Sequence, residues 1–114
     1  MNEELKKIFG ESIAVDGVSV PTAHIKYKGK ETTFVTWTII GSAPALSGDD
    51  EQLYGITTVD VDVYSKGNYL KVLAEVKRLM KMNEWLWTND SVEMFEDDTG
   101  LYHITATFEK ERVL

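Results

Sequence analysis

Apolar and polar residues alternate along several stretches of the chain, a period-two pattern that is typical of half-buried β-strands. The clearest stretch is Ile56–Tyr64, where one face carries Val59, Val61 and Val63. The opposite face carries Thr58, Asp60, Asp62 and Tyr64. This stretch predicts a strand with one face on a core.

Other stretches predict further strands. Residues 23–28 alternate, and Thr33–Ile40 is rich in the β-branched and aromatic residues that favour strands. Leu101–Glu109 predicts a last strand, with Tyr102, Ile104, Ala106 and Phe108 on one face. Trp85–Thr88 and Ser91–Glu96 are shorter strand-like segments, and Asp97–Gly100 predicts a turn.

Two stretches have helical spacing instead. Apolar residues recur every three or four positions in Tyr69–Met82, which predicts an amphipathic helix with Asn68 as its N-cap and Asn83 at its end. Asn2–Phe9 predicts a short helix that ends at Gly10, with acids in its first turn, where the helix dipole favours them.

The pattern breaks in two places. Residues 11–22 are expected to be irregular, with Asp16-Gly17 as a turn and Pro21 as a breaker. Gly41–Tyr54 is polar and rich in glycine, serine and acids, which predicts a long loop. Loops of this length are usually functional or disordered, because they cost entropy and bury little apolar surface.

The expected order is α-β-β-β-α-β-β. It indicates an α+β fold with an antiparallel or mixed β-sheet, and with one main amphipathic helix and a short N-terminal helix packed on one face. The 114 residues fit a single domain, 1–114.

Composition narrows the function classes. The chain has no cysteine, which excludes disulfides and thiolate metal sites, and its N-terminus lacks the apolar region of a secretory signal. Apolar runs are too short to span a membrane, so no membrane partner is expected. The net charge is −7, and most basic groups after residue 30 lie in residues 66–83. A duplex-DNA binder needs a broader basic face, so no sequence-specific nucleic-acid binding is expected.

The sequence contains no motif in which potential catalytic or metal-binding residues have the spacing of a known site. His24 and His103 have no second ligand at metal spacing. Asp60 and Asp62 project from one strand face, where paired carboxylates can bind a metal or act as acid and base, but a solvated face explains them more simply. The acids of residues 93–98 fit a solvated turn and lack calcium-loop spacing. We expect no enzyme, metal or cofactor.

The tryptophans and the basic residues of Tyr69–Met82 each have two interpretations. Trp37, Trp85 and Trp87 would form either a stacking platform for a ligand or, more commonly, core and interface contacts. The basic stripe of the helix would touch nucleic acid or, more simply, form a solvated face that balances an acidic sheet.

The second half of the chain carries a resemblance. Residues 56–66, ITTVDVDVYSK, resemble the strand, aspartate, aromatic and Ser-Lys signature of tail completion proteins from long-tailed phages and prophages. The amphipathic helix Tyr69–Met82 and the Thr-Gly-Leu-Tyr-His phrase within Asp97–His103 follow in the same order. The resemblance covers roughly residues 20–112 and rests on the order of short motifs. Gly41–Tyr54 departs from it, being longer and more polar than the family pattern.

The resemblance implies a structural tail terminator, found at the tail–head junction of the virion and in the host cytoplasm during assembly. Such proteins form a ring, usually of six subunits, that caps the tail tube and joins it to the head-neck connector protein. The implied partners are the tail tube protein, the connector and further copies of the chain. Segregated charge suits such head-to-tail contacts.

Two sets of residues are the hypothetical contact sites. The partner or oligomer interface would involve Ala43, Pro44, Ala45, Leu46, Leu53, Lys71 and Arg78. Asp60 and Asp62 would line a channel through which DNA passes, because an acidic lining does not hold phosphates.

Two alternatives remain. One is another phage neck or minor tail adaptor of the head-closure type. The other is a small bacterial ligand-binding or regulatory α+β domain, whose pocket would be lined by Trp85 and Trp87.

Overall fold

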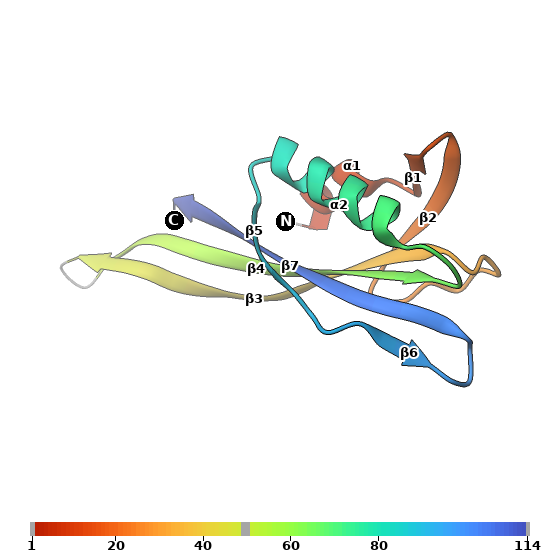
Figure 1. Ribbon diagram of the computed structural model, residues 1–114. Coiled ribbons are helices and arrows are strands. Elements are labelled where there is room, and N and C mark those ends of the chain that lie inside the picture. Colours follow the sequence, from red (N-terminus) through yellow and green to blue (C-terminus); the bar gives the residue numbers. More distant parts are fainter. Residues whose placement is uncertain (1, 49–50, 114) are drawn as a thin grey trace.

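The computed structural model describes residues 2–48 and 51–113, and for residues 44–54 and 113 it describes the backbone alone (Figure 1). It has two helices and seven strands. They are α1 (Asn2–Phe9), β1 (Ser12–Val15), β2 (Val18–His24), β3 (Phe34–Gly48), β4 (Glu51–Ser65), α2 (Leu70–Met82), β5 (Leu86–Asp90), β6 (Met94–Glu96) and β7 (Leu101–Val113). The predicted α+β class is confirmed.

The strands form one mostly antiparallel sheet in the order β1-β2-β3-β4-β7-β5, in which only the β2–β3 pairing is parallel among the described strands. β6 pairs with β7 beside β5, so β5 and β6 are successive pieces of one interrupted strand. Ser91 bridges the interruption. Its N–H donates to the carbonyl of Thr105 at 2.7 Å, and its Oγ accepts the Thr105 N–H at 2.9 Å.

One face of the sheet carries the core. Val59, Val61 and Val63 of β4 are fully buried, as the alternation predicts. Their neighbours on that face include Val35, Trp37, Ile104, Ala106 and Phe108. α2 contributes Val72, Leu73, Val76 and Met80, and α1 contributes Leu5 and Phe9. Both helices lie on the same side of the sheet in Figure 1.

The helix ends follow local chemistry. α1 ends at Gly10, whose φ of +61° is accessible to glycine and whose N–H reaches the Lys6 carbonyl at 2.7 Å. Tyr69, rather than the predicted Asn68, occupies the N-cap position of α2 and makes no side-chain cap bond. Asn68 still satisfies one helical donor, because its Oδ1 accepts the Leu70 N–H at 2.9 Å. Asn83 is the C-cap, as predicted.

The expectation of an irregular segment over residues 11–22 is wrong. β1 and β2 form a hairpin around the predicted Asp16-Gly17 turn, and Pro21 pairs with Ser12 at the end of the ladder, where proline is tolerated. The strand expected over residues 23–28 is also wrong beyond His24. Ile25 has a φ of +69°, and the Lys26 N–H bonds back to the His24 carbonyl at 2.7 Å, so the chain turns there.

The long loop expected over Gly41–Tyr54 is wrong as well. β3 continues to Gly48 and β4 begins at Glu51, with pairs such as Ala43↔Ile56 and Gly48↔Glu51. Residues 49–50 lie outside the described residues. Register shifts at Ile39/Gly41 and Pro44/Leu46 absorb the glycine and proline as bulges. Backbone pairing therefore keeps this segment in strand conformation, although its sequence lacks the alternation of apolar and polar residues that predicts a strand.

The described part of this extension, residues 41–48 and 51–58 of the β3–β4 hairpin, is called the arm below. It projects past the helices and elongates the molecule to 52 × 27 × 22 Å (Figure 1). The radius of gyration is 15.3 Å, whereas a chain of this length usually has about 13 Å.

Glu4 of α1 fastens the helix to β7. Its carboxylate accepts hydrogen bonds from Lys110 Nζ at 2.8 Å, from Arg112, and from the Trp85 indole at 3.2 Å. Burial alone would raise the pKa of Glu4, but the hydrogen bonds and charges of Lys110 and Arg112 outweigh it and lower the pKa to about 2.

Replacing Glu4 with glutamine should lower the free energy of unfolding by about 1–2 kcal/mol at pH 7. Because the folded pKa lies below the ordinary value, the stabilisation is complete above about pH 4.5 and disappears as the pH falls toward 2. Urea unfolding at pH 7 and pH 3 measures this. Glu3→Gln, exposed on the same helix, is the control. An equal loss at both pH values would contradict the ionic account.

Candidate assembly surfaces

The face of the sheet opposite the helices is called the outer face. The strand register places its residues in cross-strand rows. The first row is Phe34, Tyr64 and His103, the second is Thr36, Asp62 and Thr105, and the third is Thr38, Asp60 and Thr107. Asp60 and Asp62 therefore share a face opposite the buried valines, as predicted, but both are half-buried rather than fully solvated.

The first row is a continuous aromatic stack. Ring centroids are 4.5 Å apart for Tyr27–Phe34, 4.6 Å for Phe34–Tyr64 and 4.1 Å for Tyr64–His103. Burial, followed by the charges of Asp62 and Glu96, raises the pKa of Tyr64 to about 12. The row is therefore a continuous band of stacked rings across three strands.

The two carboxylates are held by neighbouring side chains. Asp62 accepts from His103 Nε2 at 2.9 Å and from the Thr105 hydroxyl, while Asp60 accepts from the Thr107 hydroxyl at 2.7 Å. The side chain of His103 is only 15% exposed, because it packs against Tyr64 and bonds to Asp62. His103, Thr105 and Asp62 therefore form one hydrogen-bonded network that links β4 and β7 on the outer face.

Three of the four basic residues of α2 have acidic partners within the chain. Lys71 pairs with Asp16 at 2.7 Å, Lys77 with Asp90 at 2.8 Å, and Arg78 with Glu75 at 2.7 Å. Lys71 and Arg78 remain exposed and can still reach a partner. Such exposed pairs stabilise a fold by little and exchange readily.

The tryptophans do not form one platform. Trp85 is 3% exposed and belongs to the core, whereas Trp87 is 47% exposed. Lys77 lies 4.4 Å from the Trp87 ring centroid, and the Trp87 indole donates to Asp90 at 2.9 Å. Trp85 is therefore a core residue and Trp87 a surface residue, so the two do not share one exposed stacking face.

Five of the predicted interface residues lie in the arm. Ala43 is exposed on β3. Pro44, Ala45 and Leu46 follow on β3 and Leu53 lies on β4, and their side chains are outside the described part of the structure.

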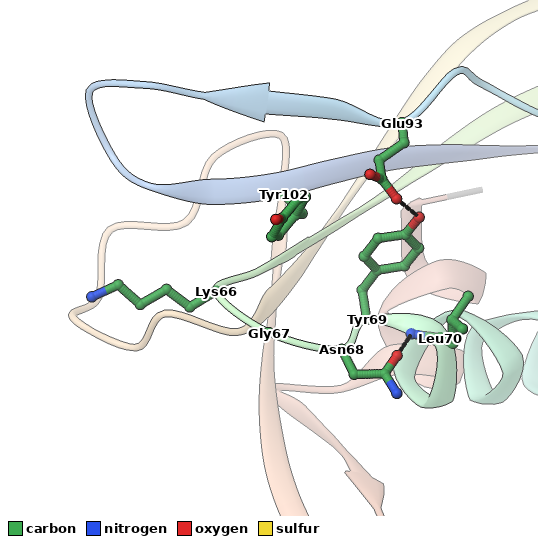
Figure 2. Close-up of a pocket in the computed structure, with 7 residues that line it drawn as sticks. All are labelled: Lys66, Gly67, Asn68, Tyr69, Leu70, Glu93 and Tyr102. Carbon is green, nitrogen blue, oxygen red and sulfur yellow. Dashed lines mark hydrogen bonds between the residues drawn. The ribbon is translucent and has the colours of Figure 1, made fainter.

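A groove of about 510 Å³ lies where β4 turns into α2 (Figure 2). Its lining residues are Lys66, Gly67, Asn68, Tyr69, Leu70, Glu93 and Tyr102. The Tyr69 hydroxyl donates to Glu93 across the groove, and this bond raises the pKa of Tyr69. Lys66 extends away from the other side chains in Figure 2. With the Glu93 carboxylate and the Asn68 amide already engaged, the groove offers mainly aromatic and backbone surface.

The sequence pattern did not predict that several apolar side chains of residues 86–95 are exposed. The exposed members are Leu86, Trp87, Val92, Met94 and Phe95. On the opposite edge of the sheet, Ile40 of β3 is 57% exposed. Exposed apolar clusters of this kind mark interaction surfaces more often than isolated apolar residues do. Only the sheet order reveals them, because it shows which strands lie at the edges.

Within residues 2–48 and 51–113, no group of three or more His, Cys, Asp and Glu side chains is placed to hold a metal ion. In the same described residues, neither α1 nor α2 has the length and apolar character that a membrane span requires. In comparison with known proteins, no protein-family model matches the chain and no curated protein matches its sequence.

Proposed function

We propose that this protein is a structural component of a phage or prophage tail, which caps the tail tube as a ring and joins it to the head-neck connector. The proposal rests first on the resemblance of residues 56–66 to tail completion proteins. Residues 56–65 form the last two thirds of β4, Lys66 follows the strand, and α2 comes next in the chain, which is the order of elements that the resemblance implies.

The observation that carries the proposal furthest is the arm. A hairpin that extends beyond the core has a shape suited to contact a neighbouring subunit. A globular domain that worked alone would gain little from it, because unpaired strand edges favour aggregation. The exposed apolar residues at both sheet edges agree with a protein that works in an assembly.

In this proposal the main helix α2 and the short helix α1 together cover one sheet face and point away from the ring axis. The outer face, with Asp60 and Asp62, then faces the channel. The tail tube protein and the connector would contact opposite ends of the ring, and the exposed residues Ala43, Lys71 and Arg78 would take part in these contacts. The protein would reside at the tail–head junction of the virion, and in the host cytoplasm before assembly.

The direct test is electron microscopy of the protein mixed with the tail tube protein encoded in the same genome. We expect tubes of limited length with a ring of density at one end. Tubes that grow without limit and carry no cap would reject the proposed function. Binding to the head connector alone, without tube capping, would favour the head-closure adaptor instead.

The channel assignment gives a separate prediction. Asp60→Lys should slow DNA ejection from assembled virions about severalfold at low salt, because a ring of lysines attracts phosphates, and the effect should fade as salt screens the charges. Asp60 is the better site for this test, since Asp62 is held by both His103 and Thr105.

Asp60→Asn is the control, because it keeps the size of the side chain and adds no positive charge. An ejection rate for Asp60→Lys equal to that of Asp60→Asn at low ionic strength would remove Asp60 from the channel wall.

A further inference from the structure

The two edges of the sheet differ, and each has unpaired backbone. On one side, β5 and β6 pair only with β7 among the described strands, so their other edge is open. On the other side, β2 covers only Val35–Trp37 of β3, and from Thr38 onward no described strand lies beside that edge. Open edges of this kind are templates for strand addition.

The register places matching apolar residues at the same level on both edges. Ile40 and Gly41 together oppose Thr58 at the β-bulge, Thr58 pairs with Glu109, and Glu109 pairs with Leu86. Ile40 is 57% exposed and Leu86 67%. Alternation places Ile40 on the face opposite the core-packed Ile39, and Leu86, opposite Glu109, lies on that same outer face.

The strand directions are also compatible. Each of the pairings β3–β4, β4–β7 and β7–β5 is antiparallel, so β5 runs opposite to β3. If a second copy continued the sheet, its β3 would lie antiparallel to β5 of the first copy. Ile40 and Leu86 would then become cross-strand neighbours, which typically lie about 4.5–5.5 Å apart between Cβ atoms.

Charge supports the same alignment. The exposed lysines Lys26, Lys28 and Lys30 lie in the connection that leads into β3. The exposed acids Glu93, Asp97 and Asp98 flank β6 at the edge formed by β5 and β6. Both groups are at the same end of the sheet, because Phe34 at the start of β3 is linked through Tyr64 and His103 to Met94 of β6. Continuing the sheet brings the lysines of one copy toward the acids of the next.

We infer that copies of this chain join head to tail by adding β5 of one copy to the open edge of β3 in the next, with Leu86 packed against Ile40. Because the two edges differ, the contact is heterologous and generates a closed ring or an open filament. The inference deepens the proposed function and takes its biological setting from it, but the contact itself requires only this chain.

Disulfide cross-linking of the full chain tests the contact, since the chain has no cysteine of its own. Ile40→Cys mixed with Leu86→Cys should form disulfide dimers about 100-fold faster than either variant alone, because only the mixture aligns the two thiols. The double variant should give a ladder of oligomers. The two positions are three strand spacings apart in one chain, roughly 14 Å, too far to bond internally. Higher salt should slow the reaction.

A control and a second pair keep the test decisive. Met82→Cys replaces an equally exposed apolar residue at the end of α2, and its mixture with Ile40→Cys should cross-link slowly. Thr38→Cys with Asn89→Cys probes the next level of the register, which runs through Asp60 and Thr107. Circular dichroism checks that each variant folds.

Three results would overturn the inference. One is cross-linking of both pairs at the rate of the Met82 control at every protein concentration. Another is dimerisation of Leu86→Cys alone as fast as the mixture, which would show a two-fold contact between identical edges. The third is cross-linking of either edge to added tail tube protein only. Ladders without tube capping would instead keep the contact and reject the proposed function.

Discussion

Replacing Phe9 with alanine should lower the free energy of unfolding by about 3–5 kcal/mol, which is a large share of the stability of an ordinary domain. Phe9 is 1% exposed and belongs to the same core cluster as the valines of β4. Removing its ring leaves a cavity between α1 and the sheet that neighbouring side chains fill only in part.

Urea unfolding followed by circular dichroism measures the effect of Phe9→Ala. Lys6→Ala, an exposed position on the same helix, is the matched control and should change stability by less than about 0.5 kcal/mol. If Phe9→Ala also costs less than about 1 kcal/mol, α1 is a loosely attached segment and does not belong to the core.

Shortening the arm should abolish the proposed tail capping and leave the fold intact. Ala43 and Ile56 form a cross-strand pair, so residues 44–55 can be replaced by Asn-Gly, a sequence suited to a two-residue hairpin turn. None of the described core residues comes from the removed segment. We expect the free energy of unfolding to change by less than about 1 kcal/mol, because surface changes away from a core usually cost little.

Electron microscopy with the tail tube protein gives the functional result, and urea unfolding gives the stability. The open edge of β3 from Thr38 to Ala43 is retained, so the Ile40 and Leu86 cross-link remains measurable in the shortened chain. A shortened protein that still caps tubes would remove the arm from the tube contact. A shortened protein that unfolds would assign the arm a structural role.

Sequence alone predicted the elements whose apolar spacing is strong. The alternation of Val59, Val61 and Val63 predicted the buried face of β4, and the spacing of Val72, Val76 and Met80 predicted the buried stripe of α2. In both, the hydrophobic effect acts on one face of one element, so a local pattern carries the information. The ends of α1 and α2 at Gly10 and Asn83 were also predictable, because capping is local.

The arm and the first hairpin could not be predicted in this way. Residues 41–48 contain Gly41, Pro44 and Gly48, which are typical of loops, yet backbone pairing with residues 51–58 holds them in β3. Strand pairing depends on the register with residues far away in the chain, such as Arg112 opposite Gly55. The local pattern of apolar and polar residues does not contain this information. Gly41 and Pro44 were interpreted as the end of a strand, whereas in the structure they lie at β-bulges within β3.

The candidate surfaces were predictable only in part. That Asp60 and Asp62 share a face followed from their spacing of two. Their bonds to His103, Thr105 and Thr107 depend on the register between β4 and β7, which are about 40 residues apart in the chain. The exposure of Leu86 could not be predicted either. An apolar residue in a strand is usually buried, and only the strand order shows that β5 lies at an edge.

The position of β7 has a consequence for how the domain is made. β7 is the last described strand to be synthesised, yet it lies inside the sheet between β4 and β5 and supplies Ile104, Ala106 and Phe108 to the core. Until it leaves the ribosome, the valine face of β4 has no partner on that side, and α1 lacks its anchor at Lys110 and Arg112. Folding must therefore wait until β7 has been synthesised, which favours slow, post-translational folding.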